Sequence, residues 1–97
     1  MKEMRESQFQ KKVIDYLKQH NVWHVKYWAG SQFTKEGVPD ILACIDGTFH
    51  GIELKTDVGV PSKLQLFNIK KIKESGGQAY ILRPKDFEDW KGEWFLK

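Results

Sequence analysis

The sequence predicts an α/β domain in which a helix, three strands, a second helix and a fourth strand follow one another along the chain. Three observations predict this class: an amphipathic period near the N-terminus, an Asp-Gly turn between two apolar runs, and a capped second helix followed by another apolar run. A chain of 97 residues supports one hydrophobic core, so we expect a single domain over residues 1–97.

The first helix is expected over about positions 3–20, because Phe9, Val13 and Leu17 recur at three- to four-residue steps with their neighbours. Glu6 continues this line toward the N-terminus. It should therefore lie near the apolar edge of the helix, and not squarely on its wet face.

Three strands are expected next. The β-branched and aromatic run VWHVKYW predicts a strand over 22–28, and a loop over 29–37 follows it. Two more strands, over 40–45 and 49–55, are joined through Asp46-Gly47, the dipeptide most typical of a tight β-hairpin.

A second helix begins with a capping box. Ser62 and Gln65 have the spacing of this motif, and the pair Gly76-Gly77 ends the helix. The remaining segments are expected to be a helix over 62–75, a strand over 78–82, a short helix or turn over 85–90 and an extended tail over 92–97.

Two acidic residues, Asp40 and Glu53, are expected to lie opposite each other in the hairpin. With Asp46 and Gly47 at the centre of a type I′ turn, paired positions add up to 93, and these two residues satisfy that sum. Opposed Cβ atoms lie about 4.5–5.5 Å apart, and like charges so close need a proton or a cation between them. Lys55 shares the face of Glu53 and offsets part of the charge, but a divalent cation does so more completely.

Other interpretations stay open at this point. Glu-x-Lys in a strand is commonly a solvent-facing ion pair, and a one-residue change of register would separate the two carboxylates. Gln65 could cap its helix, face the site, or do both. The rest of the carboxylate face is apolar or small and is expected to be covered, which favours a functional site: Leu42, Cys44, Phe49 and Gly51.

Composition and the absence of certain motifs argue against a secreted protein, a membrane protein and an enzyme with a nucleotide cofactor. The net charge of +3 and the pI near 9.0 are mildly basic, which is compatible with nucleic-acid binding and with an ordinary soluble domain. No run resembles a signal peptide or a membrane span, and Cys44, the single cysteine, is expected in the core of a cytoplasmic protein. No phosphate-binding loop or dinucleotide fingerprint appears, so no nucleotide cofactor is expected.

In their order and spacing these motifs resemble the PD-(D/E)xK nucleases, in particular the virus-type replication-repair nuclease (VRR-NUC) branch, over about residues 6–82. The resemblance is carried by Glu6, Gly37-Val38-Pro39-Asp40, Ile52-Glu53-Leu54-Lys55, Ser62-Lys63-Leu64-Gln65 and Gly76-Gly77. It implies a restriction-endonuclease-like fold, a central mixed sheet flanked by helices, and Mg²⁺- or Mn²⁺-dependent hydrolysis of phosphodiester bonds.

The resemblance also implies roles for individual residues. Asp40, Glu53 and the backbone carbonyl of Leu54 would bind the metal, with Glu6 as a further candidate ligand. Lys55 would orient or activate water and stabilise developing charge. The implied catalytic set is Asp40, Glu53, Lys55, Gln65 and Glu6.

The chain resembles the stand-alone form of this family, found in phages and bacteria. Such small members are similar to Holliday-junction-resolving enzymes, so the resemblance implies branched DNA as substrate, a role in DNA repair, a homodimer and a bacterial or phage-infected host cytoplasm. Candidate DNA contacts, each of which is also readable as a solvated side chain, are Arg5, Lys12, Lys26, Lys35 and Lys63.

The aromatic residues Trp23, Tyr27 and Trp28 could stack on unpaired bases, but core packing or a dimer interface is the more ordinary use. The leading hypothesis is a small metal-dependent DNA endonuclease. Two alternatives are a catalytically silent DNA-binding module and a subunit of a larger replication or restriction assembly. The opposed carboxylates argue against a module that only binds.

Overall fold

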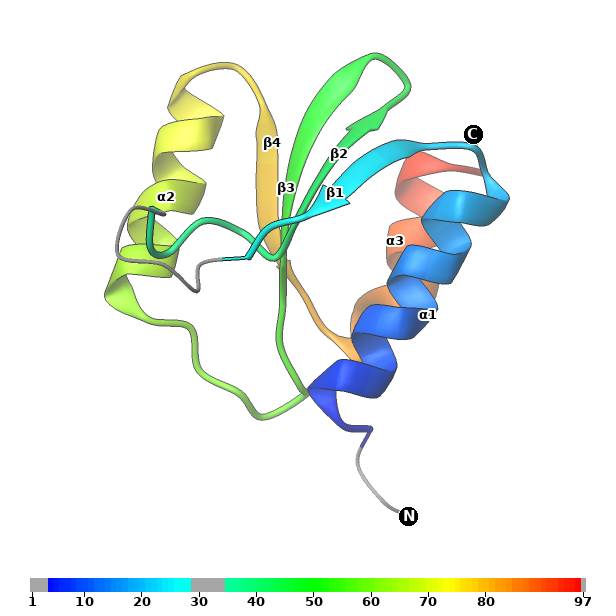
Figure 1. The fold of residues 1–97 in the computed structure, drawn as a ribbon, viewed down its shortest axis with the longest axis horizontal. Coiled ribbons are helices and arrows are strands. Elements are labelled where there is room, and N and C mark those ends of the chain that lie inside the picture. Colours follow the sequence, from blue (N-terminus) through cyan, green and yellow to red (C-terminus); the bar gives the residue numbers. More distant parts are fainter. Residues whose placement is uncertain (1–3, 29–34, 97) are drawn as a thin grey trace.

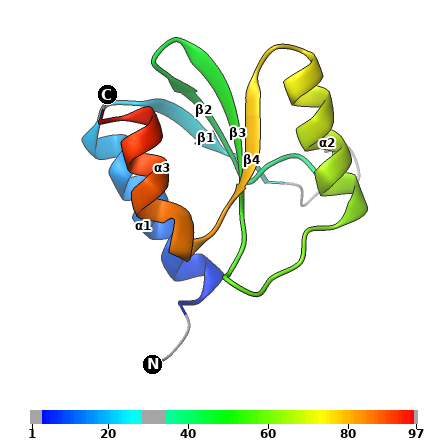
Figure 2. The ribbon, with the colours of Figure 1, turned by 180° about the vertical axis from the view of Figure 1, so that it is seen from behind.

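The computed structural model describes residues 4–28 and 35–96 and arranges them in three layers (Figure 1). A sheet forms the middle layer. Helix α2 (Lys63–Glu74) covers one face of it, whereas α1 (Glu6–Gln19) and α3 (Phe87–Trp94) lie on the other. Figure 2 shows the same separation from behind. The predicted α/β class is confirmed.

The sheet has four strands in the order of the chain: β1 (Trp23–Lys26), β2 (Ile41–Ile45), β3 (Thr48–Leu54) and β4 (Gln78–Leu82). The first three are antiparallel, and β4 runs parallel to β3 because α2 carries the chain back across the sheet. The mixed sheet that the resemblance implied is therefore present.

The core lies between the sheet and the α1–α3 layer. On α1 the fully buried positions are Phe9, Val13 and Leu17, as the period predicted, and they belong to the same cluster as Ile52 and Leu54 of β3. Burying a side chain of this kind contributes roughly 1.5–3 kcal/mol relative to leaving it exposed. This layer fixes β3, the strand that leads to the site.

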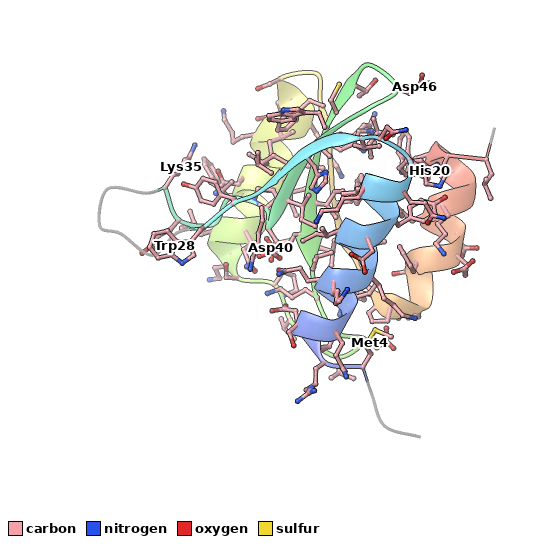
Figure 3. The ribbon with its side chains drawn as sticks, turned by 45° about the vertical axis from the view of Figure 1, so that its right-hand side comes forward. Met4, His20, Trp28, Lys35, Asp40 and Asp46 are labelled. Atoms are coloured by element: carbon pink, nitrogen blue, oxygen red, sulfur yellow. The ribbon has the colours of Figure 1, made fainter. Side chains whose placement is uncertain are left out.

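The hairpin forms with the predicted turn. Asp46 and Gly47 have φ angles of 52° and 80°, the left-handed values that a type I′ turn requires. The register pairs Ile41 with Ile52. One further step along this register sets Asp40, which directly precedes β2, opposite Glu53. Figure 3 shows Asp40 and Asp46 at opposite ends of the hairpin.

The carboxylate face is covered only in part, contrary to expectation. Cys44 is exposed instead of lying in the core, and Phe49 is 45% exposed. Trp23 and Trp28 are 66% and 70% exposed, so core packing is wrong for both. For Cys44 and Trp23 the reason is that α2 packs on β3 and β4 and leaves the β1 side of this face open. Phe49 lies on β3 but borders an open groove beside α2.

The C-terminal segment is helical where an extended tail was expected. After a short 3₁₀ turn at Pro84–Asp86, α3 continues to Trp94. Trp90 is buried and its indole donates to the Tyr80 hydroxyl at 2.8 Å, and the ring of Trp94 packs 4.5 Å from that of His50. The local sequence does not determine whether this segment is helical or extended. Packing of these rings against the sheet stabilises the helix.

Two further expectations are limited by what the structure describes. The predicted start of the first helix at position 3, and the part of the predicted loop over 29–34, lie outside the described residues. Among the described residues, no helix has the length and apolar character to span a bilayer.

Candidate active site

Asp40 is fixed at the end of the hairpin through both its backbone and its side chain. Its backbone carbonyl accepts a hydrogen bond from the Tyr27 N–H at 2.8 Å. Its carboxylate Oδ2 accepts from the Leu54 N–H, also at 2.8 Å. The carboxylate therefore lies against the backbone of Leu54, the residue whose carbonyl the resemblance implied as a metal ligand.

The segment that delivers Asp40 is packed tightly against α2. Gly37 has a φ of 77°, and a Cβ built there would come within 2.6 Å of Leu64 Cγ. The buried side chain of Asn68 donates to the carbonyl oxygens of Glu36 at 3.3 Å and Leu64 at 3.0 Å. The glycine of the G-x-P-D motif thus permits a close approach that holds the loop beside the site.

Gly37→Ala is expected to destabilise the fold more than Gly47→Ala. Both positions have positive φ, but a Cβ at position 47 meets nothing within 4 Å. The clash with Leu64 adds about 1–3 kcal/mol of overpacking to the conformational cost, or roughly 4–8 °C of melting temperature per kcal/mol in a domain of this size. Thermal melts of both variants check this, and equal losses would contradict the packing argument.

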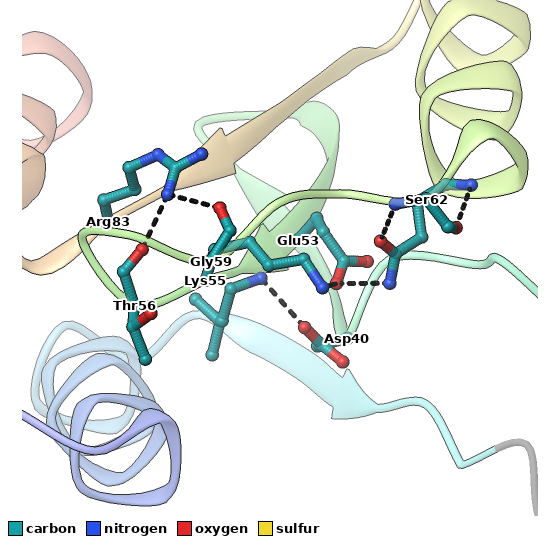
Figure 4. Close-up of polar contacts among 9 residues, drawn as sticks. Asp40, Glu53, Lys55, Thr56, Gly59, Ser62 and Arg83 are labelled. Atoms are coloured by element: carbon teal, nitrogen blue, oxygen red, sulfur yellow. Dashed lines mark hydrogen bonds and ion pairs between the residues drawn. The ribbon is translucent and has the colours of Figure 1, made fainter.

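Glu53 is a buried acid, only 2% exposed. Its Oε2 accepts from Gln65 Nε2 at 3.0 Å and lies 3.7 Å from Lys55 Nζ (Figure 4). Among the described residues its Oε1 has no hydrogen-bond partner. Burial, reinforced by the negative charge of Asp40, raises the pKa of Glu53 to about 8, although the positive charge of Lys55 opposes the rise.

Gln65 performs both of the roles considered for it. The Gln65 N–H donates to Ser62 Oγ at 3.1 Å and the Ser62 N–H donates to Gln65 Oε1 at 2.8 Å, which completes the capping box of α2. The other end of the same amide donates to Glu53. The helix cap therefore also fixes the position of the Glu53 carboxylate.

Glu6 is not brought into the same cluster. It lies exposed at the start of α1, and its charge makes only the smallest contribution to the raised pKa of Glu53. Within residues 4–28 and 35–96, no three Asp, Glu, His or Cys side chains are grouped so that they could hold a metal ion. The structure thus assembles Asp40, Glu53, Lys55 and Gln65, and leaves Glu6 outside.

The donor set suits a hard divalent cation. Mg²⁺ is usually held by one or two carboxylates, with the substrate phosphate and water supplying the other oxygens. Asp40 and Glu53 provide such a pair, and the partnerless, buried Oε1 of Glu53 is an oxygen to which no donor among the described residues is directed. The residues present therefore fit Mg²⁺ or Mn²⁺.

The candidate DNA-binding residues are distributed around the molecule. Lys63 is the first residue of α2, next to the site, and Lys26 ends β1 across from Ile41. Arg5 precedes α1 as its N-cap. Lys35 lines a groove of about 370 Å³ on the α2 side of the sheet, and Lys12 lines a separate groove between α1 and α3. Neither groove is bordered by Asp40, Glu53, Lys55 or Gln65.

Sequence reasoning missed two residues that support the site. Asn68 lies on the line of α2 that Leu64 and Ile72 continue, so a polar residue in this apolar stripe was a sign of a specific contact. Arg83, just after β4, donates to the carbonyl oxygens of Thr56 and Gly59. The sequence around it indicates only the end of a strand.

No protein-family model matches the chain, and no curated protein matches it at a significant level. Solved structures do match. One described as a VRR_NUC domain aligns with a TM-score of 0.75 and 20% identity, over 93% of this chain and 96% of that one. Hjc, a Holliday junction resolvase from Archaeoglobus fulgidus, aligns with a TM-score of 0.57 and 20% identity, over 81% of this chain and 69% of its own. The chain therefore has the fold of the VRR_NUC domain and of this resolvase.

Proposed function

We propose that this protein is a metal-dependent DNA endonuclease of the VRR-NUC type that hydrolyses phosphodiester bonds in branched DNA. The observation that carries the proposal is the buried Glu53 carboxylate, set opposite Asp40 and contacted by Lys55 and Gln65. A buried acid beside a second acid is costly for a purely structural protein, and such arrangements concentrate at functional sites. The shared fold supports the same assignment.

Each residue has a definable task in this reaction. Asp40 and Glu53 would hold Mg²⁺ or Mn²⁺, which when bound supplies positive charge that polarises a phosphoryl oxygen. Gln65 holds Glu53 in one orientation through its amide. Lys55, whose side chain is 17% exposed, directs an ammonium group toward the Glu53 carboxylate, where it can balance negative charge that builds on the phosphate in the transition state.

Branched DNA and a homodimer form the finer part of the proposal. The likeness to a Holliday junction resolvase supports a branched substrate, since such an enzyme must address more than one strand. Two copies would supply two sites. The exposed apolar residues Trp23 and Val25 on edge strand β1 are available for a second copy or for DNA.

The decisive experiment is a cleavage assay with the purified chain on four-way, flap and linear DNA, in Mg²⁺, in Mn²⁺ and with a chelator. We expect cleavage in at least one metal, faster on a branched substrate, and none with the chelator. Binding without cleavage in every metal would favour a silent DNA-binding module instead. Cleavage that needs an added partner would favour a subunit of a larger assembly.

Asp40→Asn is expected to abolish stabilisation of the protein by metal. A ligand that binds only the native state at a hundred times its dissociation constant stabilises it by about 2.7 kcal/mol, and the substituted amide would offer a neutral oxygen in place of a charged one. Melting temperatures with Mn²⁺ and with a chelator check this. An unchanged Mn²⁺ shift in the variant would remove Asp40 from the ligand set.

A further inference from the structure

The loop between β3 and α2 connects two parts of the candidate site: Lys55 at its start, and the capping box with Gln65 at its end. It begins at Lys55 and ends at Ser62, whose capping box includes Gln65. From outside the loop, Arg83 Nη1 donates to the carbonyl oxygen of Thr56 at 2.6 Å and to that of Gly59 at 2.8 Å (Figure 4). A single guanidinium nitrogen thus joins the two ends of one turn to the end of β4.

The turn that Arg83 holds directly follows Lys55 in the chain and lies beside its side chain. The Gly59 N–H donates to the Thr56 carbonyl at 3.3 Å, which closes the turn. A Cβ built on Gly59 would lie 3.5 Å from Lys55 Cδ, so the turn passes the aliphatic stem of the lysine with room for about one methyl group between them. Lys55 directly precedes Thr56, and its own N–H donates to the Leu82 carbonyl at 3.2 Å, so the turn borders the side chain of the lysine while β4 holds its backbone.

The apolar residues at the tip of the loop are not buried against the described part of the protein. Val58 is 75% exposed and Val60 is 85% exposed. Among the residues that the structure describes, polar contacts tie the tip to the rest of the protein: those from Arg83, and a hydrogen bond from the Lys85 N–H to Asp57 Oδ1 at 3.0 Å. Without the guanidinium, the conformational entropy of the turn opposes a single arrangement of its backbone.

We propose that Arg83 is a positioning residue of the nuclease site: it clamps the Thr56–Gly59 turn and so holds Lys55 beside Glu53. The inference rests on the proposed function for its catalytic consequence. Arg83 acts through backbone carbonyls, so its effect belongs to the orientation of the site and not to substrate binding. Misplacement of a catalytic group by about 1 Å can cost up to a hundredfold in rate.

The test compares Arg83→Met, Arg83→Lys and Tyr80→Phe. Methionine keeps much of the stem and removes the donors, whereas lysine restores a single cationic donor that can reach a carbonyl oxygen. Tyr80→Phe is the control: Tyr80 lies on β4, the strand that directly precedes Arg83, and the variant loses hydrogen bonds to His50 and Trp90 on the opposite face of the sheet. Each variant is measured for kcat and KM on cleaved DNA and for amide hydrogen exchange at Gly59.

We expect Arg83→Met to lower kcat about tenfold to a hundredfold with KM nearly unchanged, and to speed exchange at Gly59. Arg83→Lys should recover part of both, and Tyr80→Phe should change neither. Unchanged exchange at Gly59, or faster exchange with unchanged kcat, would overturn the proposal. If the parent protein cleaves no DNA, the proposed function fails independently of the clamp. The clamp is then tested by exchange alone: a Gly59 amide that exchanges as slowly in Arg83→Met as in the parent would overturn it.

Discussion

Glu53→Gln is expected to abolish DNA cleavage and, without metal, to make the protein more stable at pH 9 than its parent. Loss of a charged metal ligand removes several kcal/mol of transition-state stabilisation, which corresponds to about a thousandfold in rate. Glutamine keeps the shape of the side chain, and its carbonyl oxygen can still accept from Gln65. The buried negative charge is what the substitution removes.

The pH dependence follows from the direction of the pKa shift. Burial raises the pKa of Glu53 from 4.5 to about 8, so the native state retains a proton that the unfolded chain loses between these values. Stability contributed by the neutral acid is complete below pH 4.5 and is lost as the pH rises to about 8. The variant cannot lose that proton, so its stability should vary less over this window.

Thermal melts of both proteins from pH 5 to pH 9 with a chelator measure this difference. The two should be similar at pH 5 and diverge in favour of the variant as the pH rises. Parallel curves would show that Glu53 ionises in the native state with an ordinary pKa. In the parent, metal binding must also displace this proton, so Mn²⁺ affinity should rise with pH up to about 8.

The part of the site that could be predicted from the sequence is the part that local chemistry determines. Asp46-Gly47 selects a type I′ turn, this turn fixes the register, and the register brings Asp40 opposite Glu53. The capping box likewise orients Gln65 without help from distant residues. Short-range rules were sufficient here because a two-residue turn leaves no freedom of register.

The features that could not be predicted depend on tertiary packing, in particular on how far α2 extends over the sheet. Period-two alternation assigned Cys44 and Phe49 to the face of Glu53, but it could not show that Cys44 is left exposed and that Phe49 borders an open groove beside α2. Arg83 reaches carbonyls 24 and 27 positions away, which no local pattern encodes. Local rules and global packing disagree most at Glu53, a charged residue type buried in the sheet, as expected of a functional site.

Lys55→Met is expected to reduce cleavage about a hundredfold to a thousandfold, the range seen when a group that stabilises transition-state charge is removed. The methionine retains an aliphatic chain in the space beside the Thr56–Gly59 turn, so the fold should survive. Asp40 and Glu53 remain, so stabilisation by Mn²⁺ should persist. This combination distinguishes a residue that stabilises charge from one that holds the metal.

Loss of the ammonium also has an electrostatic consequence within the site. Lys55 lowers the pKa of Glu53, so its removal should raise that pKa further and move the onset of Mn²⁺ binding to higher pH. Lys70→Met, an exposed lysine on α2, is the matched control for loss of one positive charge. If both variants lose the same small amount of activity, Lys55 contributes only to the general attraction of DNA. A selective loss at Lys55 with retained metal binding would place its charge at the reacting phosphate.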